Sequence, residues 1–261
     1  RSIPIKDLIN SANYLYKQGV SEIILTGTQL GNYGFDLPEL SLTKMLKSFL
    51  ENTTIPRIRV SSLQPLEINE ELIGIWEKSQ NRLCPHFHLP LQSGSTRILK
   101  DMRRRYSKED FLHVVRLIRT SIPDANITTD VIVGFPGERD DDHRKTLEVI
   151  NNVGFSDVHI FPFSRRPGTS AWYLGEQINS SVIKNRALEI KNNSKKIRLK
   201  IMKAAVGSVR SVLWEGENQK VGLTDNYLRV YKSFGNKKKS ETPIERLRPI
   251  IENTKIVRFV D

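Results

Sequence analysis

The sequence predicts an α/β protein, in which parallel strands alternate with helices, followed by a small all-β domain. Residues 5–163 alternate helix-like and strand-like segments, which is typical of βαβ units. Strand candidates begin roughly thirty residues apart, the length of one strand and a crossover helix. After residue 205 the pattern changes to short alternating runs (SVRSVLW, NYLRVYK, KIVRFV), which predicts antiparallel strands. The expected domains are therefore residues 1–205 and 206–261.

Five segments are expected to form the parallel strands. Each has the apolar or β-branched content that suits burial on both faces of a sheet. They are residues 22–27 (EIILTG), 57–62 (RIRVSS), 85–91 (PHFHLPL), 126–135 (NITTDVIVGF) and 157–163 (DVHIFPF).

The helices are predicted from amphipathic patterns between these strands. Residues 70–78 and 111–120 are examples, and Ser107 with Asp110 forms a variant of the capping box before the second. A long basic helix is expected over residues 181–203. Because a helix over residues 5–18 opens the chain, an initial strand is expected to precede it.

Composition narrows the class of protein. Lys and Arg number 41 against 29 acidic residues, giving a formal charge of +12, which fits a polyanionic partner and an ordinary basic surface equally well. The single cysteine, Cys84, excludes a disulfide framework or thiolate cluster within this chain and indicates the cytoplasm. No apolar run has the length of a membrane span, and the N-terminal residues, RSIPIKDLI, read as the start of a fragment.

Polar or glycine residues follow every predicted strand: TGTQLG, SSLQP, QSGS, GFPGE and FSRRPGT. In parallel barrels the ligand site is built from the loops at the carboxyl ends of the strands. This repetition predicts that the loops after the strands form a common rim with a ligand site. QSGS is expected to be one of these rim loops, because its small, polar residues are unsuited to a core.

Single residues differ in how strongly they indicate a site. Asp130 stands in an apolar strand, where a carboxylate without a partner is costly, so a functional role is favoured. Gln92 is a poor helix cap, which favours a ligand contact, whereas Ser93 and Ser95 taken singly fit helix caps better. His88 fits a hydrogen-bonded core histidine and a site residue equally well.

Two further groups of residues are candidates for ligand contacts. Glu138 follows the tight turn of Gly134 and Gly137 and is either a hydrogen-bond acceptor or a solvated residue at a helix start. Arg165 and Arg166, in a rim loop, are better phosphate candidates than the helical lysines, because arginine matches phosphate geometry bidentately.

Five motifs in order resemble one known family. They are LTGTQLGNYGFDL, SSLQP, HFHLPLQSGSTRILKDMRRRY, TTDVIVGFPGE and FSDVHIFPFSRRPGTSAW. With these motifs the chain resembles the radical S-adenosylmethionine tRNA methylthiotransferases over nearly its whole length. TGTQLGNYGFDL and HIFPFSRRPGTSA most resemble the branch that modifies threonylcarbamoyladenosine beside the anticodon.

The resemblance implies a fold and a chemistry. The fold would be a partial parallel (β/α)6 radical SAM barrel lacking its first strand, which would lie upstream of Arg1, with a TRAM-like RNA-binding β-barrel over residues 206–261. The complete protein would use S-adenosylmethionine, two [4Fe-4S] clusters and an electron donor to install a methylthio group at C2 of the adenine in tRNA. Cys84 matches no cluster motif and reads as a buried small hydrophobe. This chain alone is therefore expected to be inactive.

The resemblance also assigns residues to two roles. The wall of the S-adenosylmethionine site would contain Gln29, Ser61, Ser62, His88, Gln92, Ser93, Asp130 and Glu138. RNA would be bound by Arg103, Arg104, Arg165, Arg166, Lys195 and Lys196. A cluster-free RNA-binding protein with a degenerate barrel remains the alternative, and a barrel enzyme acting on a small phosphate ester ranks last.

Overall fold

The computed structural model of the chain describes residues 1–215, 221–231, 248–252 and 256–260. All five parallel strands expected from the sequence are present in it. They are β1 (Glu22–Leu25), β2 (Arg57–Val60), β3 (His86–His88), β4 (Asn126–Val133) and β5 (Asp157–Pro162). Strand β1 pairs with β2. The other three strands pair in the order β3-β4-β5, and a parallel bridge between Ile58 and Leu83 connects the two groups of strands. The strands thus follow one another in chain order, as successive βα units dictate.

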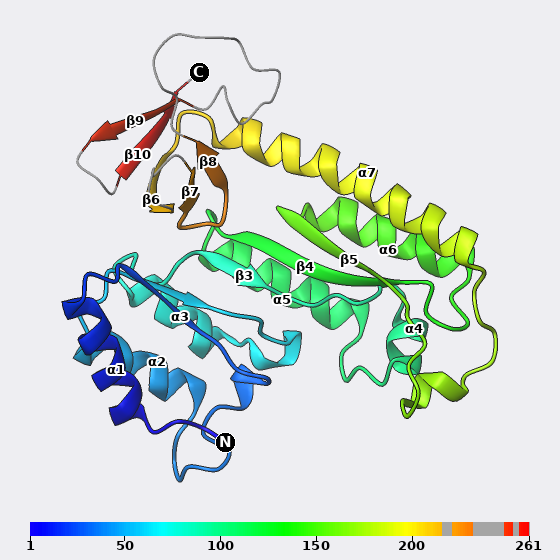
Figure 1. Cartoon of the computed structure of the whole chain (residues 1–261), viewed down its shortest axis with the longest axis horizontal. Helices are drawn as coiled ribbons and strands as arrows, with labels where there is room; N and C mark the ends of the chain where they lie inside the picture. Colours follow the sequence, from blue (N-terminus) through cyan, green and yellow to red (C-terminus); the bar gives the residue numbers. More distant parts are fainter. Residues whose placement is uncertain (216–220, 232–247, 253–255, 261) are drawn as a thin grey trace.

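Helices connect the strands and confirm the predicted alternation (Figure 1). The α-helices are α1 (Ile5–Lys17), α2 (Leu42–Asn52), α3 (Glu70–Lys78), α4 (Thr96–Asp101), α5 (Lys108–Ser121), α6 (Asp140–Val153) and α7 (Ser180–Ala205), and the 3-10 helices are η1 (Leu30–Asn32), η2 (Pro65–Glu67) and η3 (Ser170–Tyr173). The capping box of Ser107 and Asp110 starts α5 as expected.

One face of the sheet carries the core and the other face is open. On β4, Thr129, Val131 and Val133 are fully buried toward a core shared with α2, α3, α5 and α6. On the opposite face Ile24 is 57% exposed and Phe161 is 50% exposed. Because successive side chains of a strand point to opposite faces, polar residues at alternate positions of β4 lie on the open face.

The loop after β3 corrects one expectation. Ser93, Gly94 and Ser95 of QSGS are buried, because the loop passes directly over α6. Gly94 donates its backbone N–H to Thr146 Oγ1 at 2.9 Å, and an added Cβ at Gly94 would lie 2.5 Å from Lys145 O. These small residues therefore do pack in the interior, where their size permits the close approach.

The C-terminal strands form an antiparallel sheet in the order β8-β7-β6-β10-β9. They are β6 (Val209–Glu215), β7 (Val221–Thr224), β8 (Arg229–Tyr231), β9 (Arg248–Glu252) and β10 (Ile256–Val260). Residues 216–220, 232–247, 253–255 and 261 of the predicted second domain lie outside the described residues. Figure 1 places β6, β7 and β8 beside the amino ends of the parallel strands.

Buried arginines join these strands to the parallel sheet. Arg57 and Arg59 both pair with Glu22, at 2.7 and 3.1 Å, and donate to backbone carbonyls of Ser211, Thr224 and other residues of the C-terminal strands. Their side chains and that of Glu22 are less than 10% exposed. The attachment lies at the end of the sheet opposite the predicted rim. Within the described part of the chain, no helix is long and apolar enough to cross a bilayer.

Candidate functional site

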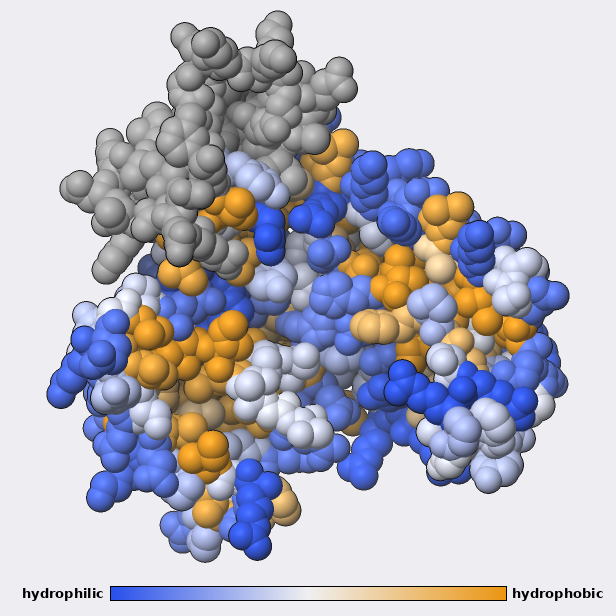
Figure 2. All heavy atoms as spheres, in the orientation of Figure 1, coloured by the Kyte–Doolittle hydropathy of each residue, from blue (hydrophilic) through white to orange (hydrophobic). Residues whose placement is uncertain are grey.

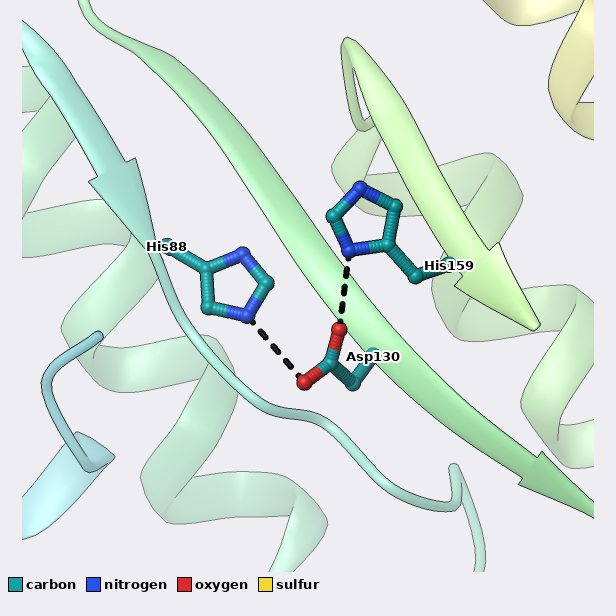
Figure 3. A group of neighbouring side chains, drawn as sticks. All are labelled: His88, Asp130 and His159. Atoms are coloured by element: carbon teal, nitrogen blue, oxygen red, sulfur yellow. Dashed lines mark hydrogen bonds and ion pairs between the residues drawn. The ribbon is translucent and has the colours of Figure 1, made fainter. Parts of the chain in front are cut away.

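Three polar side chains from neighbouring strands meet on the open face of the sheet (Figure 3). Asp130 of β4 accepts from His88 Nε2 at 3.2 Å and from His159 Nδ1 at 3.1 Å, one bond on each carboxylate oxygen. β3 positions His88 opposite Thr128, and β5 positions His159 opposite Asp130 in the parallel register. The strand pairing itself thus brings the three groups together.

Hydrogen bonds extend this cluster into the sheet. Thr128 Oγ1 lies 2.9 Å from His88 Nδ1 and 2.9 Å from His86 Nε2. An ionised Asp130 only accepts, so His88 carries its proton on Nε2 in the neutral ring, and Nδ1 accepts from the Thr128 hydroxyl. His86 Nε2 then donates to Thr128, which leaves His86 Nδ1 bare, and that atom is buried without a partner among the described residues. One proton arrangement therefore accounts for every hydrogen bond in the row and leaves only His86 Nδ1 without a partner among the described residues.

The environment shifts two pKa values along the row. Burial raises the pKa of Asp130, but the hydrogen bonds and charges of His88 and His159 outweigh it, so the pKa lies below its usual 3.8. Burial, and then the nearby Arg59 charge, hold the pKa of His86 well below 6.5. Asp130 is thus an anion and His86 a neutral ring near neutral pH.

The arrangement offers two kinds of chemistry. The donor atoms of His88, Asp130 and His159 lie within 4.8 Å of one another, and two imidazoles with a carboxylate are a donor set suited to a divalent transition metal. His159 donates its Nδ1 proton to Asp130, so in the neutral ring Nε2 is a hydrogen-bond acceptor. The His159 side chain is 48% exposed. The cluster can thus hold a cation or accept a proton from a ligand on the open face.

Cysteine placement decides whether this chain can hold an iron–sulfur cluster. Cys84 is 1% exposed, its Sγ lies 4.0 Å from Glu22 Oε2, and burial raises the pKa of the thiol to about 11. Cluster ligands are thiolates supplied by several cysteines. The residues of this chain therefore do not fit a [4Fe-4S] cluster.

Of the residues assigned to the cofactor wall, His88 and Asp130 are brought into contact and Gln92 lies beside them. Gln92 continues β3 along β4: its N–H donates to Asp130 O at 2.8 Å, and its carbonyl accepts from Ile132 N at 2.9 Å. It does so with φ 61°, a left-handed conformation uncommon for glutamine. These two backbone hydrogen bonds hold Gln92 next to the cluster, despite its left-handed backbone.

Ser93 and Glu138 have structural partners instead. Ser93 Oγ accepts from Ser95 N at 3.2 Å and lies 3.5 Å from Thr146 Oγ1 on α6. Glu138 Oε2 accepts from Gly134 N and from Arg186 at 2.7 Å, and burial raises the pKa of Glu138 despite that arginine. No contact of the described residues joins either side chain to the cluster.

Gln29, Ser61 and Ser62 lie in the loops after β1 and β2. Gln29 and Ser62 are exposed. Gln29 lines a groove of about 520 Å³ bordered by α1 and β1, where Phe35 is 80% exposed. Figure 2 shows apolar surface over this part of the molecule. These three residues are not in contact with the cluster.

The arginines and lysines assigned to RNA divide into three places. Arg103 and Arg104 line a pocket of about 410 Å³ beside η3. Arg165 stacks on Trp172 at 4.5 Å and donates to its carbonyl, and Arg166 is exposed in the same loop. The other two, Lys195 and Lys196, are exposed on α7.

Sequence reasoning missed His159, Thr128 and His86. Each is a polar residue within a predicted strand, as Asp130 is, and that signal was available for His159 in the run VHIF. What joins them is the pairing of Asp130 with His159 and of His88 with Thr128, which depends on register.

The site therefore lies on the open face of a parallel sheet whose strands succeed one another in chain order. Residues 1–150, more than half of the chain, match the radical SAM superfamily. The chain belongs to that superfamily. Solved radical SAM structures agree on the fold: coproporphyrinogen III oxidase (HemN) from Escherichia coli has a TM-score of 0.55 and 13% identity, covering 78% of this chain and 52% of that one.

Curated members of the superfamily give closer similarity in sequence. Threonylcarbamoyladenosine tRNA methylthiotransferase MtaB of Thermotoga maritima is 38% identical over 91% of this chain, and the MtaB of Bacillus subtilis is 33% identical over 88%. A tRNA-2-methylthio-N(6)-dimethylallyladenosine synthase of Acetivibrio thermocellus is 35% identical over 91%. The alignments cover 55%, 52% and 48% of these relatives, so the chain spans about half of their length.

Proposed function

We propose that this chain is part of a radical SAM methylthiotransferase that acts on tRNA, at C2 of a threonylcarbamoyl-modified adenosine next to the anticodon. The observation that carries the proposal is the 38% identity to MtaB of Thermotoga maritima across 91% of the chain. The net charge of +12 supports a polyanionic substrate, because lysine and arginine contacts to phosphates dominate affinity for nucleic acids. Such an enzyme works in the cytoplasm and needs no membrane.

S-adenosylmethionine is proposed to bind over the open face of the sheet. His88, Gln92 and Asp130 would form the centre of its wall, with Gln29, Ser61 and Ser62 in the loops of β1 and β2. Ser93 and Glu138 would act through the backbone that they hold rather than by contact. An anionic Asp130 suits hydroxyl or ammonium groups of the ligand.

Two [4Fe-4S] clusters and an external electron donor would supply the radical and the sulfur. Because Cys84 does not fit a cluster, the thiolates must come from outside these 261 residues, and the chain alone is expected to be inactive. Anaerobic reconstitution of this chain should give far less than stoichiometric iron. Stoichiometric iron with cluster absorbance would overturn this expectation.

RNA is proposed to contact the basic side chains at the rim and on α7. Arg103, Arg104, Arg165 and Arg166 would serve the anticodon region, with Lys195 and Lys196 along the helix. Residues 206–261 would form a TRAM-like RNA-binding barrel, and the antiparallel pairing of β6 to β10 supports that assignment.

The decisive experiment uses the complete, anaerobically purified protein with S-adenosylmethionine, a reductant and an anticodon hairpin carrying threonylcarbamoyladenosine. Mass spectrometry of the digested hairpin should find a methylthio group in place of one hydrogen on the adenine. The matched control is the same hairpin with dimethylallyladenosine. Product on the control alone would move the chain to the other branch, and product on neither, with clusters intact, would overturn the proposal.

Because Cys84 is the single cysteine of this chain, one alternative is an RNA-binding protein without radical chemistry. The two functions differ in cofactor affinity. In the enzyme, the substitution Asp130→Asn should weaken S-adenosylmethionine binding to the complete protein, measured by equilibrium dialysis. An RNA-binding protein should show no such binding before or after the substitution.

A further inference from the structure

The loop between β5 and α7 presents aromatic side chains beside arginines at the carboxyl end of the sheet (Figure 1). Trp172 and Tyr173 form part of its short helix η3, and Arg165 and Arg166 precede that helix. Leu174, the next residue, lines the same pocket as the end of β4, so the loop belongs to the rim at which the ligand site was expected. Aromatic and basic side chains therefore meet on this rim.

Arg165 fixes one of the two aromatic side chains. Its guanidinium lies 4.5 Å from the centre of the Trp172 ring, and its Nε and Nη2 donate to Trp172 O at 2.9 and 2.6 Å. A guanidinium over the face of an indole is an attractive contact. The preceding turn is closed by Thr169, whose hydroxyl donates to Arg166 O at 2.8 Å and whose carbonyl accepts from Trp172 N at 3.0 Å. Arg165 therefore holds η3 in place.

Tyr173 remains outside these contacts. Successive side chains of a 3-10 helix point about 120° apart, so Tyr173 is directed away from the guanidinium that covers Trp172. Tyr173 is 79% exposed, and it does not line the neighbouring pocket. Among the described residues no hydrogen bond or ring contact involves its side chain. The loop thus holds a large aromatic ring in solvent, although burial of such a ring is favourable.

The charge of the loop is suited to a phosphate. Arg166 is exposed, and among the described residues its guanidinium has no ion pair or hydrogen bond. Glu176 is the only acid in the sequence between β5 and α7. Its carboxylate faces the turn at Gly137, where an added Cβ would lie 3.2 Å from Glu176 Oε2. The positive charge of Arg166 is therefore available to a ligand.

An exposed ring beside an unpaired arginine matches an unpaired nucleotide. A single exposed apolar side chain is common on protein surfaces, but this one lies next to a cation on the rim of a site. Bases of single-stranded RNA stack on aromatic rings, while basic side chains contact the phosphates. In a duplex the faces of the bases are covered by their neighbours, so the ring would find no partner there.

We propose that Tyr173 stacks on an unpaired base in the anticodon loop of the tRNA substrate, with Arg166 on an adjacent phosphate and Arg165 as the residue that positions η3. The inference rests on the proposed function and deepens it, because it assigns a contact to one base of the RNA. It also separates the roles of the two arginines, since only Arg166 would contact the RNA directly.

The test measures binding of an unmodified anticodon hairpin to the complete protein by fluorescence anisotropy. Tyr173→Ala should weaken binding at least about fivefold, the lower end of the loss of one base stacked on an aromatic ring. Tyr173→Phe keeps the ring and should bind within about twofold of the wild type, whereas Tyr173→Leu is apolar without a ring and should bind as Tyr173→Ala does. The matched control is Tyr14→Ala on α1, where the tyrosine is 65% exposed, and its affinity should not change.

Two further sets of RNA identify the contact. A fully paired duplex of the same length should bind the wild type and Tyr173→Ala equally. Hairpins in which one loop base at a time is replaced by an abasic site should include one that also binds both proteins equally, because the missing base and the missing ring belong to the same contact.

The arginines differ in the same assay. Arg165→Gln should weaken binding of the intact hairpin but not of that one abasic hairpin, because Arg165 acts through Tyr173. Arg166→Gln should weaken binding of every RNA and reduce the dependence of affinity on salt by about one phosphate contact.

Three outcomes would overturn the inference: an unchanged affinity of Tyr173→Ala for the hairpin, an equal loss for the hairpin, the duplex and every abasic hairpin, or a Tyr173→Leu variant that binds like Tyr173→Phe. Failure of the proposed function is a separate result. The expected binding pattern without any methylthiolation by the complete protein would overturn the proposed function alone, and methylthiolation with a Tyr173→Ala variant of unchanged affinity would overturn the stacking contact alone.

Discussion

At the scale of single residues, Gly94 shows how closely the loop after β3 approaches α6. An added Cβ would lie 2.5 Å from Lys145 O and from Thr146 Cα, both backbone atoms that cannot turn away. We expect Gly94→Ala to lower the free energy of unfolding by about 1–3 kcal/mol or more, the usual cost of overpacking. The matched control is Gly74→Ala on α3, where nothing lies within 4 Å. Urea denaturation should show the control unchanged or stabilised, and equal effects would contradict the packing argument.

His86 gives a prediction about pH. Its folded pKa is lowered below 6.5, so the unfolded chain binds more protons as the pH falls below 6.5. Stability from the neutral ring is therefore complete above pH 6.5 and is lost as the pH falls toward the folded pKa, by at most about 1.4 kcal/mol per pH unit. His86→Phe keeps an aromatic ring against Tyr227, which stacks at 4.1 Å, and should flatten the dependence.

Thermal unfolding between pH 5 and 7 measures this difference. The substitution His113→Phe on the exposed face of α5 serves as the control and should keep the slope of the wild type. Parallel curves for His86→Phe and the wild type would show that another group carries the acid sensitivity.

At the scale of elements, Arg186 attaches α7 to the turn after β4 and to the start of α6. This side chain, 8% exposed, pairs with the buried Glu138 at 2.7 Å and with Asp140 at 2.6 Å. Arg186→Met leaves Glu138 buried without its cation, and we expect a loss of about 3–5 kcal/mol in unfolding free energy. Lys191→Met, exposed on the same helix, should cost less than about 0.5 kcal/mol. If Arg186→Met lowered the unfolding free energy by no more than the loss of a surface ion pair does, the Arg186–Glu138 pair would not be what stabilises the attachment of α7.

The helices and strands could be predicted from the sequence, because the apolar and β-branched residues that bury each strand lie within the strand itself. The apolar and β-branched content of segment 126–135 predicted β4, although the structure buries one face of the strand rather than both. Asp130 was singled out because a carboxylate in such a segment needs a partner. The identity of that partner could not be predicted. His159 meets Asp130 through strand register, and Ser93 is buried because α6 crosses it, and both depend on the packing of distant segments.

At the scale of the whole molecule, Glu22 stabilises the attachment of the C-terminal strands. It neutralises both Arg57 and Arg59, which hold carbonyls of those strands. We expect Glu22→Gln to cost about 3–5 kcal/mol, because two buried guanidinium groups lose their shared anion. Glu71→Gln removes the exposed pair with Lys47 and should cost less than about 1 kcal/mol. Chemical denaturation compares the two, and similar losses would contradict the assignment.

The attachment was not predictable, since RIRV read as an ordinary strand and its arginines gave no sign of partners more than 150 residues away. Charge patterns indicate a partner only when the partner lies close in sequence or on the same helix face. Long-range pairs of this kind require the fold.

The hydrogen-bonded row from His86 to His159 has a consequence for communication across the molecule. If the proton of His86 moved to Nδ1, Thr128 would have to donate to His86, and His88 would have to protonate Nδ1 to keep its bond to Thr128. A neutral His88 would then lose its proton at Asp130. Because Tyr227 of the C-terminal segment stacks on His86, this row of hydrogen bonds links the C-terminal segment to the protons that face the open side of the sheet. A change along such a link is a rearrangement of protons, with every backbone segment in place.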